Sequence, residues 1–158
     1  MQLDKISNSS LFKGMDATEL NNLSRQFRVL EMSEGSTVFI EQMPGESLYL
    51  IEEGTVKISK MFAEGEERTL VVLGPEDAFG EMAILDGAPR SATARVAETA
   101  RLLVLKKTDF DQLCASDPRL GMKLMRNIVR LFSQRVRENN DEYRQMLIWS
   151  MGRMSTSN

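Results

Sequence analysis

The segment FGEMAILDGAPRSATA, residues 79–94, sets two oppositely charged side chains on either side of a short apolar stretch. Gly80 has no Cβ, so the backbone there can approach a ligand closely. The ionised carboxylate of Glu81 only accepts hydrogen bonds, which suits hydroxyl groups. The planar guanidinium of Arg90 matches phosphate oxygens, and Ser91 adds a hydroxyl and a backbone N–H. The segment therefore predicts a pocket for a sugar phosphate.

Residues 82–86, which lie between the two charged side chains, are expected to form one helical turn. The free backbone N–H groups of such a turn also favour an anion. A simpler alternative is that Glu81 and Arg90 form an ordinary ion pair across a loop, with Gly80 and Pro89 marking turns. The residues alone leave both interpretations open.

Short runs of β-branched and aliphatic residues extend on both sides of this segment, from about residue 28 to residue 106. They are punctuated by turn residues at Gly35, Pro44-Gly45, Gly54, Gly65 and Gly74-Pro75. This pattern predicts a small all-β barrel or sandwich. The expected strands are residues 28–32, 37–40, 47–53, 55–61, 67–73, 91–96 and 101–106.

Helices are expected at both ends of this β region. Residues 16–19, DATE, form a capping-box pattern, and the helix after it should end near residues 25–27. Thr108 and Asp117 are expected to be the N-caps of two successive helices, with Pro118 at the favourable first position of the second. The second helix should run to about Ser150.

The last helix carries two apolar stripes. The first, expected to pack on the barrel, consists of Leu120, Leu124, Ile128 and Leu131. The second has the alternating spacing of four and three residues that marks a coiled-coil seam. Its members are Met125, Val129, Phe132, Val136, Asn139, Tyr143 and Met146. The second stripe favours a homodimer through this helix, and the alternative is that it folds onto the chain's own N-terminal helix.

The opening segment resembles the phosphate-binding cassette of the cyclic nucleotide-binding domain family, found in catabolite-activator-type regulators, cyclic-nucleotide-dependent kinases and cyclic-nucleotide-gated channels. The positions in register with that family's pattern are Gly80, Glu81, Pro89, Arg90, Ala92 and Thr93. The resemblance spans roughly residues 11–143 and includes LFKGM at 11–15 and SLYLIEEGTVKIS at 47–59. It departs at Gln42, where the family usually has glycine.

This resemblance implies a mainly β fold with flanking helices: a β-roll of the double-stranded β-helix or jelly-roll type, with an N-terminal helix and a long C-terminal helix. The implied domain spans residues 11–150, with the β-roll at about 28–106 and the C-terminal helices at about 108–150. Residues 1–10 and 151–158 would be tails. After the long helix no room remains for a helix-turn-helix, so the resemblance does not include a DNA-binding domain.

The resemblance also implies roles for individual residues. Glu81 would accept from the ribose 2′-hydroxyl, and Arg90 would clamp the cyclic phosphate. Gly80, Ala83 and Ala92 would contribute mainly backbone. The expected ligand-binding set is Gly80, Glu81, Met82, Ala83, Arg90, Ser91, Ala92, Asn139 and Asn140.

The expected ligand is cyclic AMP, with cyclic GMP as the alternative. In the family, residues of the last helix cap the purine, so Asn139 or Asn140 would hydrogen-bond the edge of adenine. Asn139 has two other interpretations, because a polar residue in a seam can fix the register of a dimer and an asparagine can simply be solvated. The hydroxyl of Ser91 is compatible with a guanine but also occurs in cyclic AMP binders of the family.

Composition excludes several other functions. The formal net charge is −3 and the chain has no histidine, which argues against a general nucleic-acid surface and against metal-dependent or triad chemistry. The arginines of the last helix alternate with acidic residues and are expected to form a solvated face. No apolar run approaches the length of a membrane-spanning helix, and the single cysteine, Cys114, fits a reducing cytoplasm.

We therefore expect a regulatory sensor and not an enzyme: a bound cyclic nucleotide would reposition the long helix. Its downstream effector is not named by the sequence. The alternative is a protein-interaction or dimerisation module that uses the same fold without a ligand.

Overall fold

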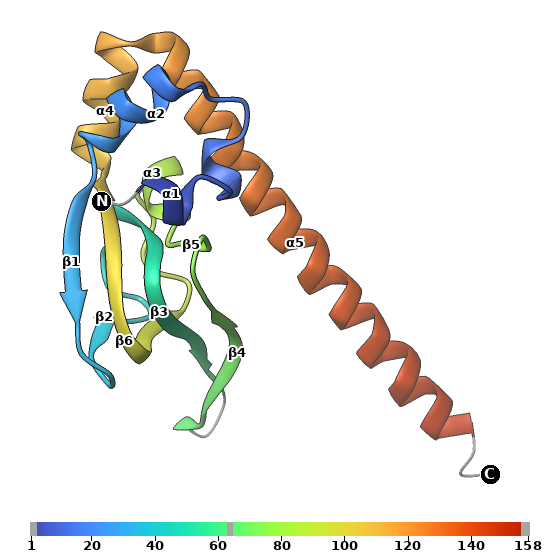
Figure 1. Ribbon diagram of the computed structural model, residues 1–158. Helices are drawn as coiled ribbons and strands as arrows, with labels where there is room; N and C mark the ends of the chain where they lie inside the picture. Colours follow the sequence, from blue (N-terminus) through green and yellow to red (C-terminus); the bar gives the residue numbers. More distant parts are fainter. Residues whose placement is uncertain (1–2, 63–64, 156–158) are drawn as a thin grey trace.

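A computed structural model describes residues 3–62 and 65–155, and within them an antiparallel sheet curls into a β-roll (Figure 1). The strand order is β1-β6-β3-β4, with β2 paired to β6 and β5 paired to β3. The strands are β1 (Arg28–Met32), β2 (Thr37–Phe39), β3 (Ser47–Met61), β4 (Glu67–Leu73), β5 (Ala78–Phe79) and β6 (Thr93–Lys106). The helices are α1 (Leu3–Ile6), η1 (Ser10–Phe12), α2 (Ala17–Ser24), α3 (Met82–Leu85), α4 (Lys107–Ser116) and α5 (Pro118–Ser155). The predicted mainly β fold with flanking helices is confirmed.

Two strands are longer than predicted, because β3 runs through residue 54 and β6 runs through residues 97–100, which we expected to separate strands. Gly54 has a φ of +86°, and a Cβ there would lie 2.7 Å from the Cα of Ala100 and overlap the carbonyl oxygen of Thr99. The pairing of β3 with β6 shifts register on either side of Gly54. This glycine therefore marks a bulge that bends a continuous strand and helps close the roll. The short β5, two residues long, was not predicted.

Helix starts agree with the sequence at two of three caps. The capping box is present, since Asp16 Oδ1 accepts from the Glu19 backbone N–H at 2.8 Å and Glu19 Oε1 accepts from that of Asp16 at 3.2 Å. Asp117 Oδ1 accepts from the Leu120 N–H at 3.2 Å, as a cap should. The prediction that Thr108 caps α4 was wrong. The Lys107 N–H donates to Glu46 O at 2.7 Å, and the helix begins at that anchored residue.

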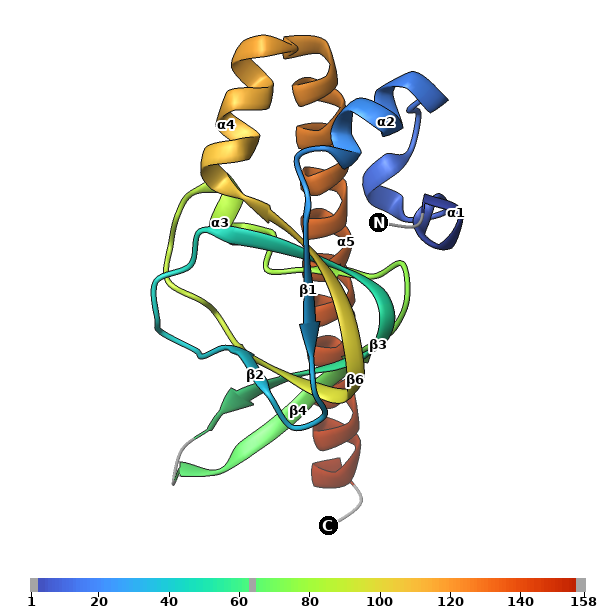
Figure 2. The ribbon, with the colours of Figure 1, turned by 60° about the vertical axis from the view of Figure 1, so that its left-hand side comes forward.

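The N-terminal segment is not the tail that we expected over residues 1–10, of which residues 3–10 are described. Ile6 in α1 is fully buried and packs in one cluster with Leu11, Leu23 and Leu124. Lys5, also in α1, forms an ion pair with Glu53 of β3. Figure 2 shows α2, α4 and the first turns of α5 gathered at one end of the roll. Apolar burial thus fixes this segment against both β3 and α5.

The helix α5 passes the roll and extends beyond it (Figure 1). It ends at Ser155, five residues past the predicted end at Ser150, so part of the expected tail over 151–158 is helical and residues 156–158 lie outside the described residues. Its first stripe is buried as predicted at Leu120, Leu124 and Ile128. No helix in residues 3–62 or 65–155 combines the length and apolar character needed to cross a membrane.

The second stripe of α5 is not covered by the chain's own N-terminal helices. Its exposed apolar members are Val129, Val136, Tyr143 and Met146, residues that are between 40% and 69% exposed. Met125 is partly buried against the core. The alternative in which this face folds onto the N-terminal helix is therefore wrong for most of its length.

Candidate functional site

The turn that follows β5 depends on a glycine. Gly80 has a φ of +74°, a left-handed conformation that residues with a Cβ rarely adopt. A Cβ there would lie 2.7 Å from Arg90 Nη1 and 3.2 Å from the carbonyl oxygen of Ser47. The helical turn predicted over residues 82–86 is present as α3. Gly80 therefore lets the chain turn from β5 into α3 directly beside the guanidinium of Arg90.

The carboxylate of Glu81 is held by the C-terminal helix. Glu81 is 6% exposed, and Arg135 Nη1 of α5 donates to its Oε2 at 2.7 Å. Arg135 Nη2 also donates to Ala78 O. The sequence interpretation placed Arg135 on a solvated face, which was wrong. Its spacing of four residues before Asn139 puts it on the same helix face, and that signal was available in the sequence.

The guanidinium of Arg90 is buried, with 6% of the residue exposed. Its Nη1 donates to Gly80 O at 3.2 Å and its Nη2 to Ser47 O at 2.9 Å. Its central carbon lies 4.1 Å from the centre of the Phe39 ring, a cation–π contact. Burial lowers the pKa of Arg90, but the group remains a cation at neutral pH.

Two features of Arg90 point to an anion. Its Nε is buried and has no hydrogen-bond partner. Within the described residues, no other buried side-chain nitrogen or oxygen is left in this way. In the same residues its guanidinium has no carboxylate partner, since Glu81 pairs with Arg135 instead. The alternative of a simple Glu81–Arg90 ion pair is therefore wrong. A buried cation with an unused donor favours a small anion such as a phosphate.

These groups meet at one cavity of about 440 Å³, a size typical of sites for small ligands. Its walls come from α3 and its flanking turns, from β3 and β4, and from the middle of α5. The predicted site residues that line it are Gly80, Glu81, Met82, Ala83, Arg90, Ser91, Ala92 and Asn139. Asn140 is not among the lining residues and is exposed on α5. The structure thus gathers the predicted set except Asn140.

Several lining residues were not predicted. They are mainly apolar side chains from distant elements together with a few charged ones: Phe39, Ile58, Lys60, Leu70, Val71, Leu73, Phe132, Arg135, Val136, Glu138 and Glu142. The apolar walls from β4 and α5 suit the flat face of a ring. No cluster of potential metal-ligating side chains is found in the part of the chain that the structure describes.

The comparison with known protein families agrees with this geometry. Residues 29–117 match the sequence profile described as the cyclic nucleotide-binding domain. The chain belongs to the cyclic nucleotide-binding domain family. The resemblance identified from the opening segment is thus confirmed, and the matched residues include α4 and all of the β-roll except its first residue, Arg28.

Relatives of the domain include regulatory proteins. The CRP-like cAMP-activated global transcriptional regulator of Mycobacterium tuberculosis is 30% identical over 136 residues, which is 86% of this chain and 59% of the relative. The chain therefore spans less than two thirds of that relative's length. The catabolite activator protein of Thermus thermophilus superposes with a TM-score of 0.79 at 33% identity, covering 87% of this chain and 63% of that one.

A third relative was solved with a ligand. The regulatory domain of Toxoplasma gondii PKA, in a co-crystal structure with cAMP, matches with a TM-score of 0.63 at 33% identity. The match covers 69% of this chain and 41% of that one. In that structure, cAMP is the ligand of the Toxoplasma gondii regulatory domain.

Proposed function

We propose that this domain is a sensor that binds a cyclic nucleotide, with cyclic AMP preferred to cyclic GMP. The observation that carries the proposal is the buried Arg90 with its unpartnered Nε beside the carboxylate of Glu81, in one cavity. A cyclic phosphate supplies the missing anion, and a ribose supplies a hydroxyl to the carboxylate. The relatives named for cAMP support the choice of nucleotide.

The polar floor of the cavity would bind the sugar phosphate. Arg90 would hold the cyclic phosphate through charge-assisted hydrogen bonds, together with the N–H and hydroxyl of Ser91. Glu81 would accept from the ribose 2′-hydroxyl. Gly80, Ala83 and Ala92 would present backbone, and Met82 would pack beside Ser91, whose Oγ lies 3.7 Å from its sulfur.

The purine would lie between the apolar walls that β4 and α5 contribute. Asn139 would hydrogen-bond its edge, because an amide both donates and accepts. Asn140 lies outside the cavity, so a base contact from it would require another position of α5. The amide of Asn139 suits either purine, so the preference for adenine rests on the relatives.

The signal would travel through the ion pair between Glu81 and Arg135, which joins the cassette to α5 across 54 residues of chain. A ribose hydroxyl on Glu81 changes the partners of that carboxylate, and so changes the stability of the present position of α5. Ligand binding would then shift an equilibrium of helix positions in proportion to its differential affinity for them.

We further propose that the domain forms a homodimer through the exposed seam of α5. The support is the row of apolar side chains at heptad spacing that a single chain leaves in solvent, Val136 among them. Val136→Lys should convert the dimer to monomer in sedimentation velocity. Arg137→Lys, at an exposed position of the same helix, is the control. A dimer unchanged by Val136→Lys would exclude this interface.

Thermal unfolding in the presence of cyclic AMP, cyclic GMP and linear AMP tests the sensor function. A ligand at 100 times its dissociation constant should stabilise the domain by about 2.7 kcal/mol. We expect cyclic AMP to raise the midpoint most and linear AMP least. No shift with any of the three would reject the sensor and favour the ligand-free interaction module.

A further inference from the structure

We propose that the loop between β2 and β3, residues 40–46, is a positioning element for the phosphate-binding guanidinium, and that Gly45 sets where Arg90 can lie. This loop is not part of the phosphate-binding segment, and Gly45 is not among the residues that line the cavity. The inference deepens the proposed function, on which it rests for the identity of the ligand.

The loop first fixes the backbone of Arg90. The Gln42 N–H donates to Arg90 O at 2.9 Å, and the Arg90 N–H donates to Met43 O at 2.9 Å. Both backbone hydrogen-bonding groups of the arginine are therefore engaged by two consecutive loop residues. Such a pair of bonds sets the direction in which the side chain leaves the main chain.

Residues at the two ends of the loop then constrain the side chain itself. Just before the loop, the ring of Phe39 at the end of β2 lies against the guanidinium carbon, 4.1 Å from ring centre to carbon. At the other end, a Cβ on Gly45 would lie 2.5 Å from Arg90 Cζ and 2.8 Å from Cδ, and closer still to Nε. Real Cβ atoms do not approach so closely, so any side chain at position 45 must displace the guanidinium.

The backbone of the loop is itself held in an uncommon conformation. Gln42 has a φ of +72°, in the left-handed region that disfavours residues with a Cβ. Strain of this kind persists only where the surrounding contacts over-determine it. Those contacts include the bond from Gln42 to Arg90, so the strained residue is also one that fixes the arginine.

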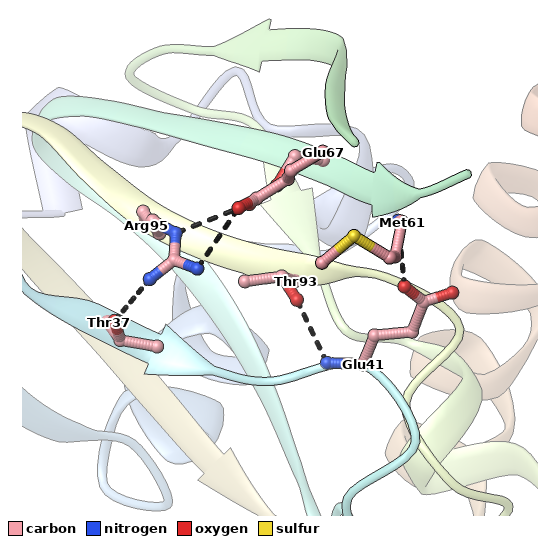
Figure 3. Close-up of polar contacts among 7 residues, drawn as sticks. Thr37, Glu41, Met61, Glu67, Thr93 and Arg95 are labelled. Atoms are coloured by element: carbon pink, nitrogen blue, oxygen red, sulfur yellow. Dashed lines mark hydrogen bonds and ion pairs between the residues drawn. The ribbon is translucent and has the colours of Figure 1, made fainter. Parts of the chain in front are cut away.

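The loop is anchored to the wall of the cavity as well. Figure 3 shows the Glu41 N–H donating to Thr93 Oγ1 and the Met61 N–H donating to Glu41 Oε2, each at 3.0 Å. Met61 ends β3, whose hairpin partner β4 lines the cavity. The same figure shows Arg95 joined to Glu67 of β4. The loop that holds Arg90 is thus bonded to β6 and β3, and β3 pairs with β4, the strand that would cover the purine.

Gly45→Ala is the direct test, with Gly74→Ala as its matched control. Neither glycine has a positive φ, and a Cβ on Gly74 would meet nothing within 4 Å. We expect Gly45→Ala to weaken cyclic AMP binding about tenfold in calorimetry, the scale of a lost charge-assisted hydrogen bond. Gly74→Ala should bind within about twofold of the wild type.

A double mutant separates positioning from a general structural effect. Once Arg90→Ala has removed the side chain that the new Cβ would strike, Gly45→Ala should change the remaining affinity by no more than about twofold. If Gly45→Ala alone leaves binding unchanged, or weakens it equally in the Arg90→Ala background, the proposal is wrong.

A ligand-free measurement keeps this proposal distinct from the proposed function. In arginine-labelled protein, the Nε–Hε NMR signal of Arg90 should be shifted by the Phe39 ring and should move in Gly45→Ala but not in Gly74→Ala. That result would support the positioning role even if no cyclic nucleotide bound to the wild type. An unmoved signal would overturn it. If Gly45→Ala does not fold, Phe39→Leu should move the same signal, and failure to do so has the same meaning.

Discussion

Replacing Arg135 with methionine should destabilise the domain in the absence of any ligand. The substitution keeps an apolar stem on α5 but removes the donors to Glu81 and Ala78. The side chain of Glu81 is 7% exposed, so its carboxylate would be left unpaired where water hardly reaches it. Breaking a fully buried pair in this way costs about 3–5 kcal/mol.

The expected loss is smaller than that range, because the Arg135 side chain is 28% exposed and water can partly replace it. We expect a loss of about 2–3 kcal/mol in the free energy of unfolding, the scale for leaving a buried charged acceptor without its partner. For a chain of this length the midpoint should fall by roughly 2–4 °C per kcal/mol. Urea unfolding followed by circular dichroism measures the free energy of unfolding, and thermal unfolding followed by the same signal measures the midpoint.

Arg137→Met is the matched control, since Arg137 is an exposed arginine two positions along the same helix. It should change stability by no more than about 0.5 kcal/mol. The double variant Arg135→Met with Glu81→Gln should recover part of the loss, because the unpaired charge is gone. If Arg135→Met is no more destabilising than the control, the ion pair is an ordinary surface contact and cannot carry a signal to α5.

Three further changes have defined outcomes. Arg90→Ala should lower cyclic AMP affinity about 10- to 150-fold in calorimetry, the equivalent of about 1.5–3 kcal/mol for a charge-assisted contact. Gln42→Gly should raise the free energy of unfolding by about 0.5–1 kcal/mol in urea, because it relieves a left-handed conformation. The pKa of Glu67 is lowered from 4.5 by hydrogen bonds from Ser59 and Arg95. Its folded pKa lies below its unfolded one, so its stabilisation is present above about pH 4.5 and lost as the pH falls further. Glu67→Gln should flatten the acid limb of a pH–stability curve.

The phosphate-binding segment was predictable because its parts are close in sequence. Gly80, Glu81 and Arg90 lie within one segment of about ten residues, so their residue types and spacing can be recognised without knowledge of the fold. Arg135 was not predictable in the same way, because its contact with Glu81 joins positions 54 residues apart. In sequence it is one of several arginines that alternate with acidic residues. Its spacing from Asn139 places it on the candidate face of α5, but only the packing of α5 against the roll shows that its partner is Glu81.

Two glycines were misinterpreted in the sequence because their roles depend on tertiary contacts. Gly54 was expected to separate two strands, yet it lies where β3 passes so close to Thr99 and Ala100 that a Cβ would overlap them. Gly45 was expected only to form a turn, and its contact is with Arg90. A glycine that gives a turn its φ and a glycine that makes room for another side chain look identical in a sequence. Only the fold tells them apart.

The two attachments of α5 differ in a way that bears on how a signal would move it. Near its start, Asn127 is 2% exposed and donates to Leu11 O at 2.8 Å and to Lys13 O at 3.0 Å, among fully buried apolar side chains. Further along, Arg135 forms an ion pair with Glu81 of the cassette, and a ligand hydroxyl would compete with Arg135 for that carboxylate. The first attachment contains nothing that a nucleotide touches, whereas the second includes the carboxylate on which the ribose would act. A ligand-dependent change would therefore act on the part of α5 beyond Asn127, which is also the part that carries most of the exposed seam.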